Sequence, residues 1–309
     1  DCGGFALVEW DDKLYRLDND NFMWWTVDPD DTVEPWVQAG RLPLPPGYCR
    51  QLLIYFDLAG EPAIHAITRV GVYGYDGGTY KFSPTPLTYP STVSAGKGAC
   101  VWRGELYVPV GSSIYKYNGQ TIQVVGPDKD DGMPPHLRGD VVQCVPGHGF
   151  WFAVISGVSN EAVPLTRVEG LDIGWPTNDT WFANTQFHGA LLVSPGVSWH
   201  ILDTSLSTAP YGAAIAATTD NRYRVWWSNG EGVWYSELPV GLHNPLANPT
   251  SRYRERGEVI TPWVDMGWAE IDKQARSIDL EVDGLERSGG SITVYAAWDG
   301  DEDSWHRIG

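Results

Sequence analysis

The sequence predicts an all-β protein: a β-propeller of about six four-stranded blades, followed by a partial antiparallel β-sandwich module. A meander of short strands returns several times along the chain, and its copies are spaced as propeller blades are. Glycine and proline also interrupt the 309 residues too often for a long amphipathic helix. The most helix-like segment, Trp268 to Ser277, has little apolar periodicity.

The clearest copy of the meander is Cys100 to Gly119. It holds three short alternating runs separated by two tight turns, Arg103-Gly104 and Gly111-Ser112. Alternation with a period of two gives each strand one half-buried face, which indicates an antiparallel sheet. Other segments match this template or part of it: Trp10–Leu17, Cys144–Val154, Phe187–Val193 with Gly196–Asp203 and, more loosely, Pro62–Gly77 and Ala217–Glu237.

The spacing of the copies favours a propeller over a sandwich. The central residues of the expected second strands lie 50, 42, 44, 41 and 33 residues apart: Tyr15, His65, Tyr107, Trp151, Leu192 and Val225. Four short strands in about 40–50 residues is the length of a propeller blade, whereas a sandwich has no reason to repeat a whole meander. We therefore expect the propeller over residues 1–250, and an abrupt start at residue 1 leaves room for blades upstream.

In chain order, the expected blades are as follows. The first uses residues 5–10, 13–18 and 21–27; the second Cys49–Asp57, Pro62–Val70, Val72–Tyr75 and Thr79–Phe82; the third Lys97–Val125. The fourth begins at Asp140, the fifth spans Thr180–Leu202 and the sixth Tyr211–Leu238. Three long loops, Asp28–Gly47, Pro127–Arg138 and Ser156–Trp175, are expected on the surface, where they can contact other molecules.

A polar linker, Pro239–Gly257, leads to the sandwich module over 258–309. Its expected strands are Glu258–Met266, Arg276–Val282, Ser291–Trp298 and Trp305–Ile308. The pattern stops within a strand at Gly309, so we expect the module to be truncated.

Charge and cysteine usage exclude several classes. The formal net charge of −18 repels phosphate, so we expect no specific nucleic-acid partner. No apolar run reaches the roughly 20 residues of a membrane helix, and no signal-peptide pattern opens the sequence. Of the four cysteines, at 2, 49, 100 and 144, Cys100 and Cys144 hold the same template position, which indicates buried free thiols.

The search for chemistry ends without catalytic, cofactor or metal residues, so we expect no enzyme and no cofactor. The seven histidines have no zinc-site spacing, and no GxSxG elbow is present. Asp299–Asp303 and Asp128–Gly132 resemble parts of calcium loops but are better explained as solvated turns. Ser228–Trp234 echoes a sialidase Asp-box but has Gly230 in place of the aspartate.

Aromatic residues give the alternative prediction, carbohydrate contact. Such rings can stack on sugars, although rings between sheets more often fill the core. The candidates are Trp24-Trp25, Trp36, Trp175, Trp181 and Trp226-Trp227. In each adjacent pair, alternation places one ring inward and one outward.

One stretch carries a family resemblance: Ile260–Arg276, continued by Ile278–Leu285 and Ile292–Asp299. It resembles bacteriophage tail and virion-associated proteins in which a β-propeller precedes a β-sandwich. The resemblance departs at Val294-Tyr295, which lack the intervening residue of the family pattern. It implies a non-enzymatic structural protein of a phage virion, located in the particle, with a role in assembly and in host attachment.

The partners implied are other virion proteins, copies of the chain itself and a host surface glycan, without membrane insertion. The alternative is a secreted or surface propeller that binds polysaccharide or, less favoured, hydrolyses it.

Overall fold

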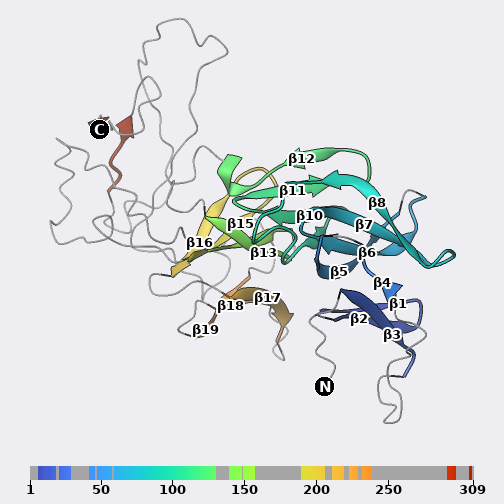
Figure 1. Cartoon of the computed structure of the whole chain (residues 1–309). Helices are drawn as coiled ribbons and strands as arrows, with labels where there is room; N and C mark the ends of the chain where they lie inside the picture. The colour runs from blue at the N-terminus through green and yellow to red at the C-terminus, as the bar shows by residue number, and fades with distance from the viewer. Residues whose placement is uncertain are drawn as a thin grey trace, which may run out of the picture. The chain divides into compact units, whose positions relative to one another are not determined.

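A computed structural model gives the structure of the chain (Figure 1). It describes residues 6–18, 21–28, 42–45, 47–57, 59–129, 139–147, 149–156, 189–205, 211–218, 223–228, 232–238, 291–296 and 306–307. The chain divides into two compact units, one of residues 1–160 with 186–260 and one of residues 161–185 with 261–309. The expected boundaries at 250 and 258 stay predictions.

The described part of the first unit is built from five antiparallel meanders, called here the first to fifth sheets. The first sheet holds β1 (Ala6–Trp10), β2 (Lys13–Leu17), β3 (Phe22–Thr26) and β4 (Leu42–Pro43). The second holds β5 (Cys49–Phe56), β6 (Pro62–Thr68), β7 (Gly71–Asp76) and β8 (Lys81–Thr88). The third holds β9 (Cys100–Trp102), β10 (Glu105–Val110), β11 (Ser113–Tyr117) and β12 (Ile122–Val124), and a 3₁₀ turn, η2 (Pro127–Lys129), follows it.

The fourth sheet holds β13 (Asp140–Pro146), β14 (Trp151–Ser156), β15 (Gly189–Ser194) and β16 (His200–Ser205). The fifth holds β17 (Gly212–Ala217), β18 (Tyr223–Ser228) and β19 (Val233–Glu237). In the second unit, β20 (Tyr295–Ala296) pairs antiparallel with β21 (His306–Arg307), and both lie inside strands expected from the sequence. Across these described residues no helix is long and apolar enough to span a membrane.

One expected division of the chain is wrong. The fourth and fifth repeats form a single sheet, because β15 pairs with β14 from Trp151↔Ser194 to Ser156↔Gly189. The long loop expected at Ser156–Trp175 thus lies between the second and third strands of one blade. The third strand, β15, pairs directly with the second, β14. Residues 6–238, as far as they are described, contain five sheets in place of the six expected.

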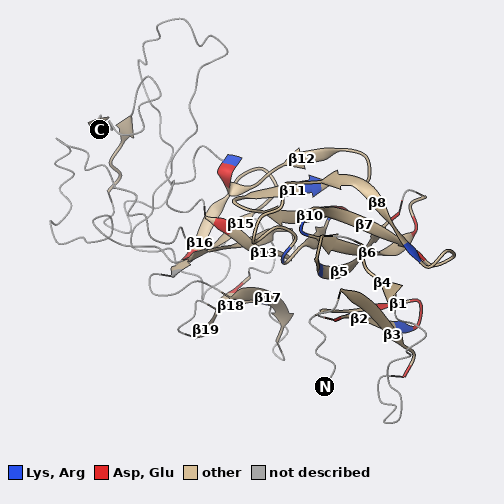
Figure 2. Cartoon of the chain, in the orientation of Figure 1, with Lys and Arg blue, Asp and Glu red and all other residues tan. Residues whose placement is uncertain are grey.

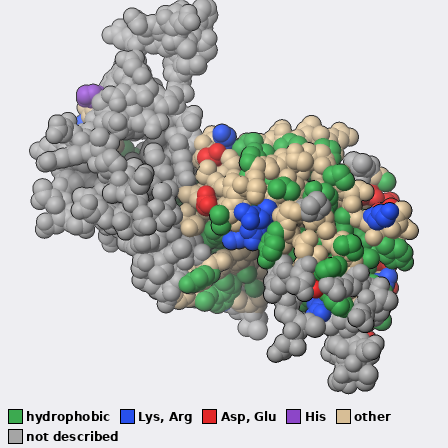
Figure 3. All heavy atoms as spheres, viewed as in Figure 1, with side chains coloured by type: hydrophobic (Ala, Val, Ile, Leu, Met, Phe, Trp, Pro, Cys, Tyr) green, Lys and Arg blue, Asp and Glu red, His purple; other side chains and the backbone are tan. Residues whose placement is uncertain are grey.

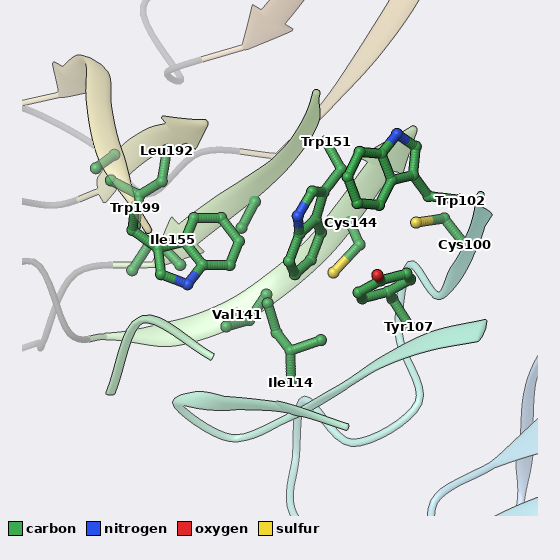
Figure 4. Close-up of a cluster of buried hydrophobic side chains, with 12 residues drawn as sticks. Cys100, Trp102, Tyr107, Ile114, Val141, Cys144, Trp151, Ile155, Leu192 and Trp199 are labelled. Carbon is green, nitrogen blue, oxygen red and sulfur yellow. The ribbon is translucent and has the colours of Figure 1, made fainter. Parts of the chain in front are cut away.

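Each sheet packs on the next one in chain order, and four apolar clusters fill the four interfaces. The first and second sheets share Tyr15, Leu17, Met23, Leu52, Ile64 and Ala66; the second and third share Tyr55, Ile67, Leu87, Leu106, Val108 and Tyr117. The third and fourth share Tyr107, Ile114, Trp151 and Ile155 (Figure 4), and the fourth and fifth share Phe152, Val154, Leu191, Val225 and Trp227. A series of four-stranded meanders stacked face to face is the propeller-type architecture that the repeats predict.

Indole and amide side chains tie neighbouring sheets together in a repeated way. Trp10 and Trp102 each end a first strand, and their Nε1 atoms donate to Pro62 O and Gly147 O of the following sheet, both at 3.3 Å. This equivalence is the one that the match of Trp10–Leu17 to Trp102–Pro109 predicts.

Glutamines at bulges in two other first strands make the second kind of tie. Gln51 Nε2 donates to Ala99 O at 3.0 Å, and Gln143 Oε1 accepts from Ala213 N at 2.8 Å. Each of these bonds joins the start of one sheet to the start of the next.

The turn between the third and fourth strands also repeats, with the pattern Tyr-Asx-Gly-x-Thr at 75–79 and 117–121. Asp76 Oδ1 accepts from Gly78 N at 2.8 Å, and Asn118 Oδ1 accepts from Gln120 N and Thr121 N at 3.0 and 2.8 Å. A short side chain that bonds the backbone two residues ahead specifies such a turn locally.

The thiols lie as predicted. Cys100 on β9 and Cys144 on β13 are buried in the cluster between the third and fourth sheets, and both are free (Figure 4). The backbones before β9 and within β13 lie close together beside these thiols. Cys144 N donates to Gly98 O at 2.7 Å, and a Cβ on Gly98 would lie 2.5 Å from Gln143 Cα. Cys49 is also buried and free, and Cys2 lies outside the described residues.

Candidate functional site: an uncovered face on the fifth sheet

The second strands of the five sheets share one feature: each places an aromatic ring on the face that looks toward the following sheet. These rings belong to Tyr15, His65, Tyr107, Phe152 and Trp226. The following sheet buries the first four, which are 1–3% exposed. Trp226 is only half-buried, so within the described part of the chain no sheet covers the corresponding face of the fifth sheet.

Strand alternation sets which residues share this face. On β18, Val225 and Trp227 point into the cluster with the fourth sheet, so Trp226 points the opposite way, with Ala214 and Tyr235 as its cross-strand neighbours. Ala214 is exposed, and Tyr235 is 53% exposed. A tryptophan and a tyrosine beside a small alanine form an apolar surface that is open to solvent.

The two rings are held together and bordered by a charge pair. The Trp226 and Tyr235 ring centroids lie 4.8 Å apart with an angle of 43° between the planes. The Arg224 guanidinium lies 4.8 Å from the Tyr235 centroid, and its Nη2 is 3.1 Å from Glu237 Oε1. Because Arg224 and Glu237 compensate each other, the border of the face carries both signs of charge and little net charge.

The edge of the fifth sheet is also uncovered in the described residues. Three described strands form this sheet, where the other four sheets have four, so β19 is an edge strand. Leu238 N donates to Tyr223 O, and antiparallel alternation then turns the backbone groups of Val233 and Tyr235 outward. An exposed edge with apolar side chains is a template for pairing with another chain.

Of the aromatic candidates, both adjacent pairs divide as alternation predicts. Trp25 packs in the cluster between the first two sheets, whereas Trp24 lies on the opposite face, where its Nε1 donates to Asp18 Oδ2 at 2.6 Å. Trp227 is buried and Trp226 faces outward. Trp36, Trp175 and Trp181 lie outside the described residues.

The described residues contain no group of three or more His, Cys, Asp or Glu side chains arranged to hold a metal. Asp128 lies in η2, where Ser113 Oγ donates to its Oδ2 at 2.5 Å, while residues 130–132 and Asp299–Asp303 are outside the description. Of the Asp-box-like segment, Ser228 ends β18 and Trp234 lies in β19, while residues 229–231 lie outside the described residues.

His65 is a buried histidine in a packing position. Its Nδ1 lies 3.0 Å from Ala63 O, and its ring makes an edge contact with Tyr55. Burial lowers the pKa of His65, which keeps the ring neutral. A neutral ring at 2% exposure between two sheets fills the core.

Comparison with known proteins gives structural likenesses only. No protein-family model matches the chain, and no curated protein matches it. Among solved structures, the computationally designed protein Ika8 matches with a TM-score of 0.42 and 9% identity, covering 78% of this chain and 72% of that one.

Two further structures match at a similar level. YCF48 bound to a D1 peptide has a TM-score of 0.40 and 12% identity, covering 77% of this chain and 67% of that one. A chain from an S. cerevisiae complex of Dbp5 with Nup159 and Gle1 has a TM-score of 0.40 and 10% identity, covering 75% of this chain and 59% of that one. Because these scores are low, the description of the fold rests on the chain's own sheets and their packing.

Sequence reasoning missed that the fifth sheet is the uncovered one. The signal was present in part, since β18 reads Arg-Val-Trp-Trp and so must place one tryptophan on each face. Which face another sheet covers is a tertiary property, and no local pattern records it.

Proposed function

We propose that this protein is a non-enzymatic structural component of a bacteriophage virion, in the tail or associated with it. It acts through contact, in particle assembly and in attachment to the host surface. The resemblance of residues 260–299 to phage virion proteins motivates the virion assignment. The uncovered face of the fifth sheet is the observation that supports a contact role.

The argument from that face is one of packing. In each of the five sheets the second strand turns a ring toward the side of the following sheet, and four of these rings are covered by that sheet. A soluble protein gains by covering such a surface, since about 25 cal/mol is recovered per Å² of apolar area buried. Trp and Tyr are also the residues that most often dominate binding interfaces. Another virion subunit, or a further copy of this chain, supplies the cover in the assembled particle.

Incorporation into particles tests the proposal. A phage deleted for this gene is complemented with the wild-type chain or with the Trp226→Ala/Tyr235→Ala variant, and purified particles are quantified by mass spectrometry. Loss of central interface aromatics costs about 2 kcal/mol or more, so incorporation of the variant should fall about 30-fold. Tyr80→Ala is the control, because Tyr80 is 65% exposed on another sheet.

Two outcomes contradict the proposal. Absence of the wild-type chain from purified particles rules out the virion role, and normal incorporation of the double variant rules out the fifth-sheet contact. Circular dichroism of each variant separates a lost contact from a lost fold.

Carbohydrate binding is the second candidate, and the exposed ring of Tyr235 beside the Arg224–Glu237 pair favours it. A sugar ring stacked on an aromatic platform can accept hydrogen bonds from a guanidinium and donate them to a carboxylate at its rim. If particles lack the protein while the purified chain binds bacterial polysaccharide and loses that binding in Tyr235→Ala, this second function replaces the first.

A further inference from the structure

A group of basic side chains lies at one end of the second sheet, away from the uncovered face of the fifth sheet. Arg50 lies near the start of β5, Arg69 follows the end of β6, and Lys97 lies shortly before β9. Figure 3 shows Lys and Arg side chains gathered at one place on the viewed face, and Figure 2 marks basic positions beside β5 and β10. Arg50, Arg69 and Lys97 are called here the basic cluster.

Backbone and side-chain contacts place all three residues around the loop 92–98. Arg50 Nη2 donates to Val93 O at 3.3 Å. Gly96 lies directly against the carbonyl of Thr68, the residue before Arg69, and Lys97 is the next residue in the loop. Lys97 is exposed, whereas Arg50 and Arg69 are half-buried.

Arg50 is held in a fixed position. Its guanidinium lies 4.9 Å from the centroid of the Tyr48 ring, and the bond to Val93 O fixes its far end. Tyr48 has a φ of +58°, a left-handed conformation that is rare for a bulky residue and that tends to mark functional sites. Arg69 N donates to Gly47 O at 3.0 Å, which ties this strained segment to the second arginine.

The cluster has unused hydrogen-bonding capacity. The Nε atoms of Arg50 and Arg69 are buried and have no hydrogen-bond partner among the described residues. Because these two atoms are enclosed by protein, the donors that a ligand could reach are the outer guanidinium nitrogens and the Lys97 ammonium group.

The cluster also lacks carboxylate partners, although the chain as a whole is acidic. The ion pairs found among the described residues are Lys116–Glu105, Lys129–Asp128 and Arg224–Glu237, and none of them involves the cluster. One carboxylate reaches the loop, because Ser94 Oγ donates to Asp140 Oδ2 at 3.3 Å, but no described ion pair joins Asp140 to the cluster. The three cations therefore keep a local positive potential within a protein of net charge −18.

We propose that the basic cluster binds a single oxyanion, a phosphate, sulfate or carboxylate group, carried by a small ligand whose apolar part lies on the Tyr48 ring. Arginine presents a planar fork of donors that matches these groups, and lysine adds a mobile positive charge. Tyr48 is 46% exposed, which leaves ring surface free for such a contact. The surrounding negative charge disfavours an extended polyanion, so one charged group is the unit that this site recognises.

Calorimetric titration of the full chain with inorganic phosphate tests the proposal, with sodium chloride at matched ionic strength as the blank. Arg69→Gln and Lys97→Gln each remove one charge, and neither side chain makes a described hydrogen bond or ion pair. Each should weaken phosphate binding about tenfold, the size of one charge-assisted hydrogen bond. Lys81→Gln is the matched control: Lys81 is exposed at the opposite end of the same sheet, roughly 17 Å away along β7.

Parallel titrations identify the source of the oxyanion. Sulfate and glucuronate are run beside phosphate: tighter binding of glucuronate indicates an acidic sugar, and tighter binding of phosphate indicates a phosphorylated ligand. The proposal is overturned if none of the three binds above the chloride blank, or if Lys81→Gln weakens binding as much as the cluster variants. It is also overturned if a short oligothymidylate binds more tightly than all three, because the site would then recognise an extended strand.

Discussion

Replacement of Trp151 by phenylalanine is expected to leave the protein at least as stable as before, although Trp151 is among its most buried residues. Its ring lies in the cluster between the third and fourth sheets, 4.4 Å from the Tyr107 ring and 4.5 Å from the Trp199 ring (Figure 4). Trp151 Nε1 is buried without a hydrogen-bond partner among the described residues. In contrast, Trp199 Nε1 donates to Val125 O at 3.0 Å.

Trp151→Phe and Trp199→Phe therefore differ in whether the indole N–H that is removed was hydrogen-bonded. Trp→Phe removes about 40 Å² of buried apolar surface, which costs about 1 kcal/mol at either site. At Trp151 the change also removes an unsatisfied buried donor, which regains about 1–3 kcal/mol. At Trp199 it breaks a hydrogen bond and leaves Val125 O without that donor, for a further loss of about 1–3 kcal/mol.

We expect Trp151→Phe to leave the unfolding free energy unchanged or to raise it by up to about 2 kcal/mol, and Trp199→Phe to lower it by about 2–4 kcal/mol. Urea unfolding followed by far-UV circular dichroism measures both, and the chain has other tryptophans that make fluorescence a poor readout. Equal destabilisation by the two variants would refute the assignment of hydrogen bonds across this interface.

Two further predictions concern titration and thiol chemistry. Because burial lowers the pKa of His65, the unfolded chain takes up this proton at higher pH than the folded protein, so stability falls as the pH drops below 6.5. His65→Gln should remove that part of the slope in urea unfolding measured between about pH 7.5 and about pH 5; an unchanged slope contradicts it. Burial and the neighbouring Cys100 raise the pKa of Cys144, so both thiols should resist iodoacetamide in the native protein and react in urea, whereas a linked Cys100–Cys144 peptide would show the pairing to be wrong.

The local part of the fold could be predicted because its signals are local. Alternation and two glycine turns give β9, β10 and β11 almost residue for residue within Cys100–Gly119. The apolar alternation around Cys100 and Cys144 likewise predicts their burial, although the two thiols enter the interface between the third and fourth sheets from opposite sides.

The division into blades could not be predicted in the same way. The pairing of β15 with β14 joins residues that are more than thirty positions apart, across an excursion whose length breaks the regular spacing. A constant repeat length assumes that loops are short in every blade. One long connection inside a blade therefore makes half-blades look like two separate repeats.

The basic cluster illustrates a second limit of sequence reasoning. Arg50, Arg69 and Lys97 are separated by 19 and 28 residues, so no motif groups them. They meet because β5 begins, β6 ends and β9 begins at the same end of neighbouring sheets. An overall acidic composition gives no warning of such a local basic site, because net charge is a sum over the whole chain.

The uncovered face of the fifth sheet shows why residue type alone does not identify a contact surface. An aromatic ring on this face of a second strand packs between two sheets elsewhere in the protein, as the burial of Tyr15, Tyr107 and Phe152 demonstrates. Trp226 differs from them in exposure and not in chemistry. Its significance therefore comes from the place of its sheet, the last of the five described sheets in chain order, where the regular series of covered faces ends. A partner that packs on this face needs an apolar strand surface opposite the Trp226 ring, as each following sheet provides for the ring of the sheet before it. It also needs a hydrogen-bond acceptor for Arg224 and a donor for Glu237, which border the face.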